Sequence, residues 1–73
     1  MLTFEPLRIL LVKRNIKKMD FVRSVGMSSG TAAKLWNDDY VALDIIDRIC
    51  EVLDCEVEDV VRRKKTEKTP PYN

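Results

Sequence analysis

Apolar residues recur with helical spacing at the start of the chain. Leu7, Leu10 and Leu11 follow the i, i+3, i+4 spacing of one helix face. Pro6 suits the first turn of such a helix, because the N–H group that proline lacks has no partner there. The pattern therefore predicts a first helix over residues 5–14.

Two shorter apolar faces follow, separated by a glycine. A second helix is predicted over residues 18–24, and Gly26 can end it because glycine adopts the left-handed conformation without steric cost. Ser28 is a good N-cap for a third helix, since its hydroxyl can accept a hydrogen bond from an unpaired backbone N–H. The inward side chains of these two helices are Phe21, Val22, Val25, Ala32 and Leu35.

The clearest amphipathic pattern comes next and keeps a period of about 3.6 residues for three turns. Its apolar positions are Ala42, Ile45, Ile46, Ile49, Cys50 and Leu53. On the opposite face, Asp44 and Arg48 are four residues apart, where we expect them to pair. A last helical turn over residues 57–61 would close the core. No stretch alternates with period two over the length of a strand, so the predicted fold is all-α with five short helices.

Length and composition allow one small domain. The chain has 73 residues, of which 45% are apolar and 34% are charged, as is typical of globular proteins. We place the domain at residues 1–61 and interpret residues 62–73, a basic segment that contains two prolines, as a disordered tail. The sequence has neither an apolar run long enough to span a membrane nor the basic start of a signal peptide, so we expect a soluble, cytoplasmic protein.

The chain contains two cysteines, Cys50 and Cys55, and no histidine. Two thiols fall two ligands short of a structural zinc site, so we expect no metal and no other cofactor. We interpret the cysteines as reduced, partly buried thiols that pack as small hydrophobic side chains. We also predict that the protein is not an enzyme, because the sequence has no glycine-rich phosphate loop and no matched nucleophile and base.

Charge is distributed unevenly, although the net charge of the chain is only +1. Residues 1–37 carry seven basic and two acidic side chains, for a net charge of +5. Residues 38–61 carry nine acidic side chains and one basic one, for −8, and residues 62–73 carry +4. A polyanion would therefore approach the first part of the chain. We interpret the acidic part as the solvated surface of the later helices; the alternative is a docking surface for a basic partner.

Two short helices joined by a glycine-containing turn can place the second helix in the major groove of DNA. Residues 18–37 resemble the helix-turn-helix of the Cro and phage-repressor family, the xenobiotic-response-element type. The likeness extends over about residues 4–61, through Val25-Gly26-Met27-Ser28 and the later run Leu43-Asp44-x-Ile46-x2-Ile49-Cys50-x2-Leu53. The resemblance implies the five-helix, lambda-repressor-like DNA-binding fold.

The resemblance also implies a DNA-contacting surface. The exposed face of the third helix would reach base edges and phosphates with hydroxyl and lysine side chains. Lys17 and Lys18, at the start of the second helix, would contact the phosphate backbone. The DNA-binding residues that the resemblance implies are Lys17, Lys18, Ser28, Ser29, Gly30, Thr31, Lys34 and Asn37.

Some positions depart from what a strong DNA reader needs. Gly30 adds no side chain and weakens its helix by up to about 1 kcal/mol relative to alanine. Asp38 and Asp39 follow the third helix directly, where two carboxylates would repel phosphate. Trp36 is interpreted as an edge of the core; the alternative is an exposed anchor for a partner protein.

Two hypotheses of function follow. The first is a DNA-binding transcriptional regulator, a repressor or a Cro-like protein of bacterial or phage origin. It would bind a double-stranded DNA operator as a homodimer, or as a heteromer with another regulator. The alternative is an antirepressor or modulator that uses the same fold to bind a partner repressor protein. Neither hypothesis involves a membrane or a small-molecule ligand.

Overall fold

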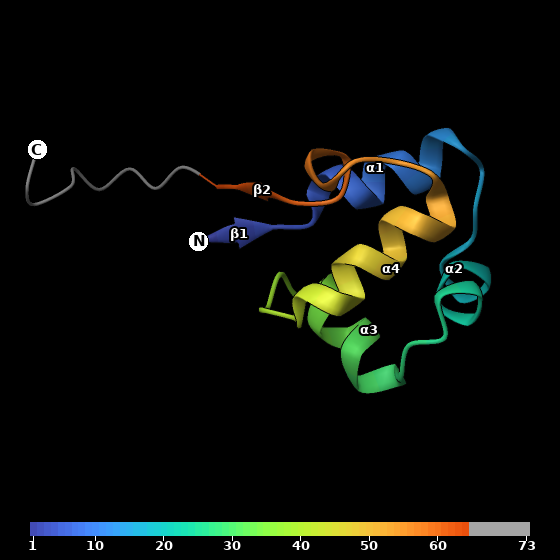
Figure 1. The fold of residues 1–73 in the computed structure, drawn as a ribbon, viewed down its shortest axis with the longest axis horizontal. Helices are drawn as coiled ribbons and strands as arrows, with labels where there is room; N and C mark the ends of the chain where they lie inside the picture. The colour runs from blue at the N-terminus through green and yellow to red at the C-terminus, as the bar shows by residue number, and fades with distance from the viewer. Residues whose placement is uncertain (65–73) are drawn as a thin grey trace, which may run out of the picture.

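The structure is a computed structural model that describes residues 1–64. Its elements, in order, are β1 (Leu2–Thr3), α1 (Glu5–Lys13), α2 (Lys18–Val25), α3 (Ser29–Trp36), α4 (Leu43–Leu53), the 3-10 turn η1 (Val57–Asp59) and β2 (Arg62–Arg63). The α4 helix runs through the middle of the domain, with α1 and η1 toward one end and α2 and α3 toward the other (Figure 1). Within residues 1–64, no helix is long and apolar enough to cross a membrane.

The four predicted α-helices are confirmed, with ends that differ from the prediction by a residue or two. The predicted fifth helix is instead the single 3-10 turn η1. A capping box closes this turn on itself: the Glu56 N–H donates to Asp59 at 3.0 Å, and the Glu56 side chain accepts from the Asp59 backbone. The backbone then crosses to α1, where the Leu7 N–H donates to the Val60 carbonyl at 3.2 Å.

The prediction that the chain has no strand is wrong. β1 pairs antiparallel with β2, with Leu2 opposite Arg63 and Thr3 opposite Arg62. Each strand has two residues, which is too short for alternation to show in the sequence. Two arginines that the sequence places in the tail therefore belong to the folded part. The predicted disorder of residues 65–73 lies outside the described residues.

The core takes one fully buried side chain from each helix and one from the residue that follows η1. These side chains are Leu7, Phe21, Leu35, Ile49 and Val60. Burial of a side chain of this size contributes about 1.5–3 kcal/mol. Because every helix supplies one such residue, the relative positions of the helices depend on the same small cluster.

Asp38 joins the end of α3 to the start of α1. The residue at the N-cap of α1 is Phe4, which has no polar side chain, and the Asp38 carboxylate accepts the Phe4 N–H at 2.8 Å in its place. The same carboxylate accepts a hydrogen bond from the buried Thr3 hydroxyl at 3.2 Å and pairs with Arg8 at 3.1 Å. Chiefly through its hydrogen bond, Arg8 holds the pKa of Asp38 below its usual range, and the Phe4 N–H adds to the effect.

Two further arginines fix the ends of helices. Arg48 of α4 donates to the Val25 carbonyl at the end of α2, at 3.4 Å, rather than forming the expected pair with Asp44. Arg14 donates to the Leu53 carbonyl at the end of α4. Both contacts satisfy carbonyl groups that a helix terminus leaves unpaired.

The Asp38 contacts generate a prediction about stability. Replacing Asp38 with alanine leaves the start of α1 without its acceptor, so we expect Asp38→Ala to lower the free energy of unfolding by about 1–3 kcal/mol. Asp39→Ala, which changes an exposed neighbour, should have little effect. Because the folded state lowers the pKa of Asp38, its contribution is present above about pH 4 and is lost as the pH falls further. Urea denaturation of the three proteins from pH 7 to pH 3 would test this; equal stability of both variants at pH 7 would contradict it.

Candidate nucleic-acid interface

A tight turn at Gly26 joins α2 to α3. Gly26 has φ 78° and ψ 28°, in the left-handed region, and its N–H donates to the Val22 carbonyl at 3.0 Å. The next residue, Met27, is buried and its N–H lies 3.4 Å from the same carbonyl. The predicted end of the second helix is thus confirmed, and the turn redirects the backbone into α3.

The start of α3 is capped as predicted. The Ser28 hydroxyl oxygen accepts the Thr31 N–H at 3.2 Å and donates to the Thr31 hydroxyl at 3.1 Å. These two side chains, both predicted to contact DNA, are therefore hydrogen-bonded to each other in the free protein. These hydrogen bonds fix the first turn of α3. Ser29 and Gly30 lie between the two bonded residues.

The face of α3 that points away from the core carries most of the predicted DNA-binding residues. Ala32 and Leu35 are buried beneath the helix. The exposed predicted residues are Ser28, Ser29, Gly30, Lys34 and Asn37, while Thr31 is partly buried. Hydroxyl groups and a lysine at these positions can donate hydrogen bonds to base edges or to phosphates.

Lys17 and Lys18 lie at the start of α2, and both are exposed. The Lys18 Nζ is 4.7 Å from the centroid of the Trp36 ring, an attractive position for a cation over an aromatic face. Trp36 is partly buried and contacts Phe21, with ring centroids 6.1 Å apart, which agrees with its interpretation as an edge of the core. The indole therefore places Lys18 beside the C-terminal end of α3.

The structure changes the interpretation of the two aspartates after α3. Asp38 is paired with Arg8 and hydrogen-bonded to the start of α1, so its charge is largely compensated. Asp39 is exposed. The expectation that two carboxylates would repel phosphate here is thus wrong for Asp38, because its charge is paired with Arg8.

The sequence did not indicate that three residues, Arg8, Asp38 and Arg48, support this surface. Arg8 and Asp38 hold the end of α3 against α1, and Arg48 holds the end of α2 against α4. The partners are 23 to 30 residues apart in the chain. Local spacing gives no signal for such pairs, since it reports neighbours along one helix face.

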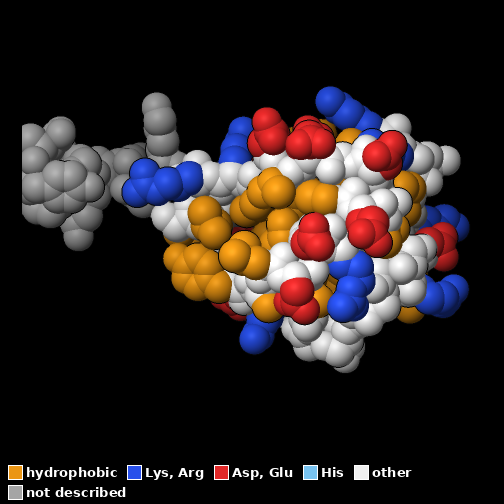
Figure 2. All heavy atoms as spheres, in the orientation of Figure 1, with side chains coloured by type: hydrophobic (Ala, Val, Ile, Leu, Met, Phe, Trp, Pro, Cys, Tyr) orange, Lys and Arg blue, Asp and Glu red, His pale blue; other side chains and the backbone are white. Residues whose placement is uncertain are grey.

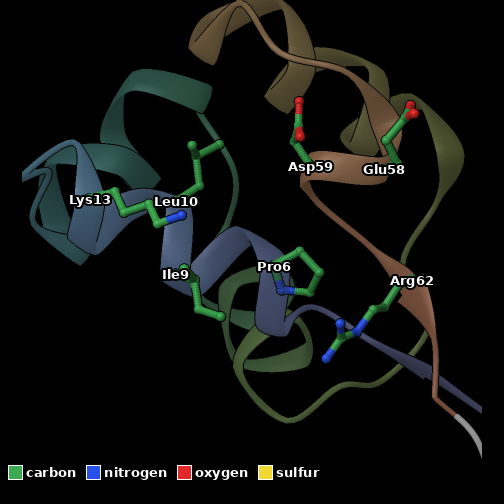
Figure 3. Close-up of a pocket in the computed structure, with 7 residues that line it drawn as sticks. All are labelled: Pro6, Ile9, Leu10, Lys13, Glu58, Asp59 and Arg62. Carbon is green, nitrogen blue, oxygen red and sulfur yellow. The ribbon is translucent and has the colours of Figure 1, made fainter.

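A groove of about 260 Å³ lies elsewhere, between α1 and the η1–β2 segment (Figure 3). Its floor is apolar, and its rim mixes lysine and arginine with aspartate and glutamate. The lining residues are Pro6, Ile9, Leu10, Lys13, Glu58, Asp59 and Arg62. The groove contains none of the predicted DNA-binding residues, which lie on and beside α2 and α3.

A capped, exposed helix that follows a short helix and a left-handed glycine turn defines a helix-turn-helix DNA-binding domain. A family model for the Cro/C1-type helix-turn-helix DNA-binding domain matches residues 6–66. The chain belongs to this family, which confirms the resemblance found in the sequence.

One solved structure similar to this chain is that of the transcriptional regulator VanUg. The two chains are 34% identical and superpose with a TM-score of 0.82, over 84% of this chain and 81% of that one. No curated protein matches the sequence.

The two glycines of this region should respond oppositely to alanine. Gly26 has a positive φ, so Gly26→Ala should lower the free energy of unfolding by about 1 kcal/mol, although a Cβ there meets no atom within 4 Å. Gly30 is helical and a Cβ there meets only the Ser28 Oγ at 3.8 Å, so Gly30→Ala should raise stability by up to about 1 kcal/mol. Urea denaturation of both variants measures the difference. A shift of the same sign in both would mean that the turn is not held as described.

Proposed function

We propose that this domain is a transcriptional regulator, a repressor or a Cro-like protein, that reads double-stranded DNA with α3 in the major groove. The observation that carries the proposal is the exposed first turn of α3, capped by Ser28, with Lys34 on the same helix and two lysines at the start of α2. The N-terminal residues of α3 would contact base edges, and the lysines of α2 would contact the flanking phosphates. Bound at an operator, the domain would exclude polymerase or a competing regulator by occupying the site.

Electrostatics support this orientation. Lys17, Lys18 and Lys34 lie on α2 and α3, whereas the acidic residues of the chain concentrate on α4 and η1. An approaching polyanion is therefore attracted to the α2–α3 side of the domain and repelled from the other side. The same surface has few long polar side chains that could discriminate between bases. A single copy would thus bind DNA with low specificity.

We propose that the protein binds DNA as a homodimer, through an apolar face between α4, η1 and the β ribbon. The most exposed members of this face are Tyr40, Leu43 and Val57, at 70%, 83% and 54% exposure. They surround a shallow apolar groove of about 80 Å³, whose further lining residues are Leu2, Phe4, Val41, Ile46 and Val61. An apolar surface of this kind, bordered by charged residues, is typical of a protein contact site.

Charge favours a second copy as the occupant of this face. Acidic side chains border the apolar patch on the side of α4 and η1, and basic side chains lie on the side from which β2 extends (Figure 2). A twofold axis through the patch would place the acidic border of one copy against the basic border of the other. A surface with opposite charges on its two sides is therefore complementary to itself.

Lysine substitutions test the DNA-binding proposal. In a mobility-shift titration with the promoter region of its own gene, Lys34→Ala and the double variant Lys17→Ala/Lys18→Ala should each weaken binding. Each lost phosphate contact should lower the slope of log K against log salt by about 1. Lys13→Ala, which removes an exposed lysine of α1, is the matched control and should leave the slope unchanged. Unchanged affinity in both test variants would remove these lysines from the interface.

The homodimer is tested by placing a charge on the apolar face. By analytical ultracentrifugation, the wild-type protein should dimerise, and Leu43→Lys should weaken the dimer at least about tenfold, since it buries an unpaired charge. Val12→Lys changes a residue of α1 that is 79% exposed and lies outside the face, and it should leave the dimer intact. A monomeric wild-type protein that co-purifies with a second regulator, and loses that partner on Leu43→Lys, would favour the antirepressor alternative.

A further inference from the structure

The end of α4 brings the two cysteines of the chain together. Asp54 has φ 50° and ψ 60°, in the left-handed region, and the Cys55 N–H donates back to the Cys50 carbonyl at 3.0 Å. This hydrogen bond, from the second residue after the helix to a carbonyl of its last turn, is the 6→1 bond of the Schellman type of helix cap. In such motifs the two bonded residues usually contact each other through apolar side chains. Here both residues are cysteines.

Both thiols are free in this structure. They are partly buried and pack against the core, which confirms the packing expected from the sequence. Burial raises the pKa of the Cys55 thiol to about 11, and the neighbouring Cys50 adds to the shift through its charge and a hydrogen bond. Asp59 of η1 raises the pKa further, whereas Arg14, just after α1, lowers it.

We propose that Cys50 and Cys55 are a redox modification site, which a low-molecular-weight disulfide converts to an intramolecular disulfide. The thiolate of one cysteine attacks the oxidant and releases one small thiol, leaving a mixed disulfide on the protein. The other cysteine, as its thiolate, then attacks the protein-bound sulfur and releases the second small thiol. In total, two protein thiols lose two electrons and two protons, and the oxidant is reduced to two small thiols.

The place of this pair in the fold determines the consequence of oxidation. The sulfur–sulfur bond would link the last turn of α4 to the residues that lead into η1. It would restrict the unfolded chain and hold the existing cap, so it should stabilise the domain while the surface of α2 and α3 keeps its shape. The site is independent of the proposed DNA binding, and either can fail without the other.

The test treats the reduced full-length protein with oxidised glutathione under native conditions, blocks the remaining thiols by alkylation and measures the intact mass. We expect a product 2 Da lighter than the reduced protein, with no alkylated thiol and no retained glutathione. Its thermal midpoint should exceed that of the reduced protein by about 5–10 °C. Dithiothreitol should restore both the mass and the thermal midpoint.

Single variants control for the chemistry. Cys50→Ser and Cys55→Ser should each stop at the mixed disulfide and retain one glutathione, because the second attacking thiol is absent. A wild-type protein that retains glutathione on both cysteines, that forms disulfide-linked dimers on a non-reducing gel, or whose thiols remain fully alkylatable would overturn the proposal. The wild-type readout decides the question even if a variant does not fold.

Discussion

The fold depends on one carboxylate that serves two helices. Asp38 follows α3 in the left-handed conformation, with φ 59°, and accepts the backbone N–H of Phe4 where α1 begins. Arg8, one turn into α1, holds the same carboxylate and also reaches the Leu35 carbonyl of α3 at 3.4 Å. The contact thus fixes the first helix against the helix proposed to enter DNA. In a domain of this size, where few core residues are available, such polar ties help to define a single arrangement of helices.

Most of the helix-turn-helix could be predicted from the sequence, because its signals are local. The glycine at the turn, the serine at the N-cap and the apolar positions of α2 and α3 each act within four residues, and the structure agrees with all of them. The errors concern features that need a distant partner or are very short. β1 has two residues and pairs with residues about 60 positions later in the chain. Arg48 donates a hydrogen bond to the Val25 carbonyl of α2 and does not pair with its neighbour Asp44. The role of Asp38 in joining α3 to α1 was missed for the same reason. Its partners Arg8 and Phe4 lie 30 and 34 positions earlier in the chain.

The domain presents two surfaces of different chemistry. The α2–α3 side has the lysines and hydroxyl groups that suit a phosphate backbone, and the α4–η1 side has acidic residues, an apolar face and the cysteine pair. This division would allow the proposed DNA binding, self-association and thiol chemistry to occur on separate surfaces. Because α3 presents mostly small side chains, specificity would come from two copies acting together more than from any single contact.

We propose that DNA binds to the surface formed by α2 and α3. The most direct test is an NMR titration of the 15N-labelled protein with a DNA duplex from its own promoter region, read as changes in amide chemical shift. If this surface faces the DNA, the largest changes will map to residues 17–18 and 28–37. Changes confined to the apolar face around Leu43 and Val57, or no change at DNA concentrations that saturate a known operator binder, would contradict it.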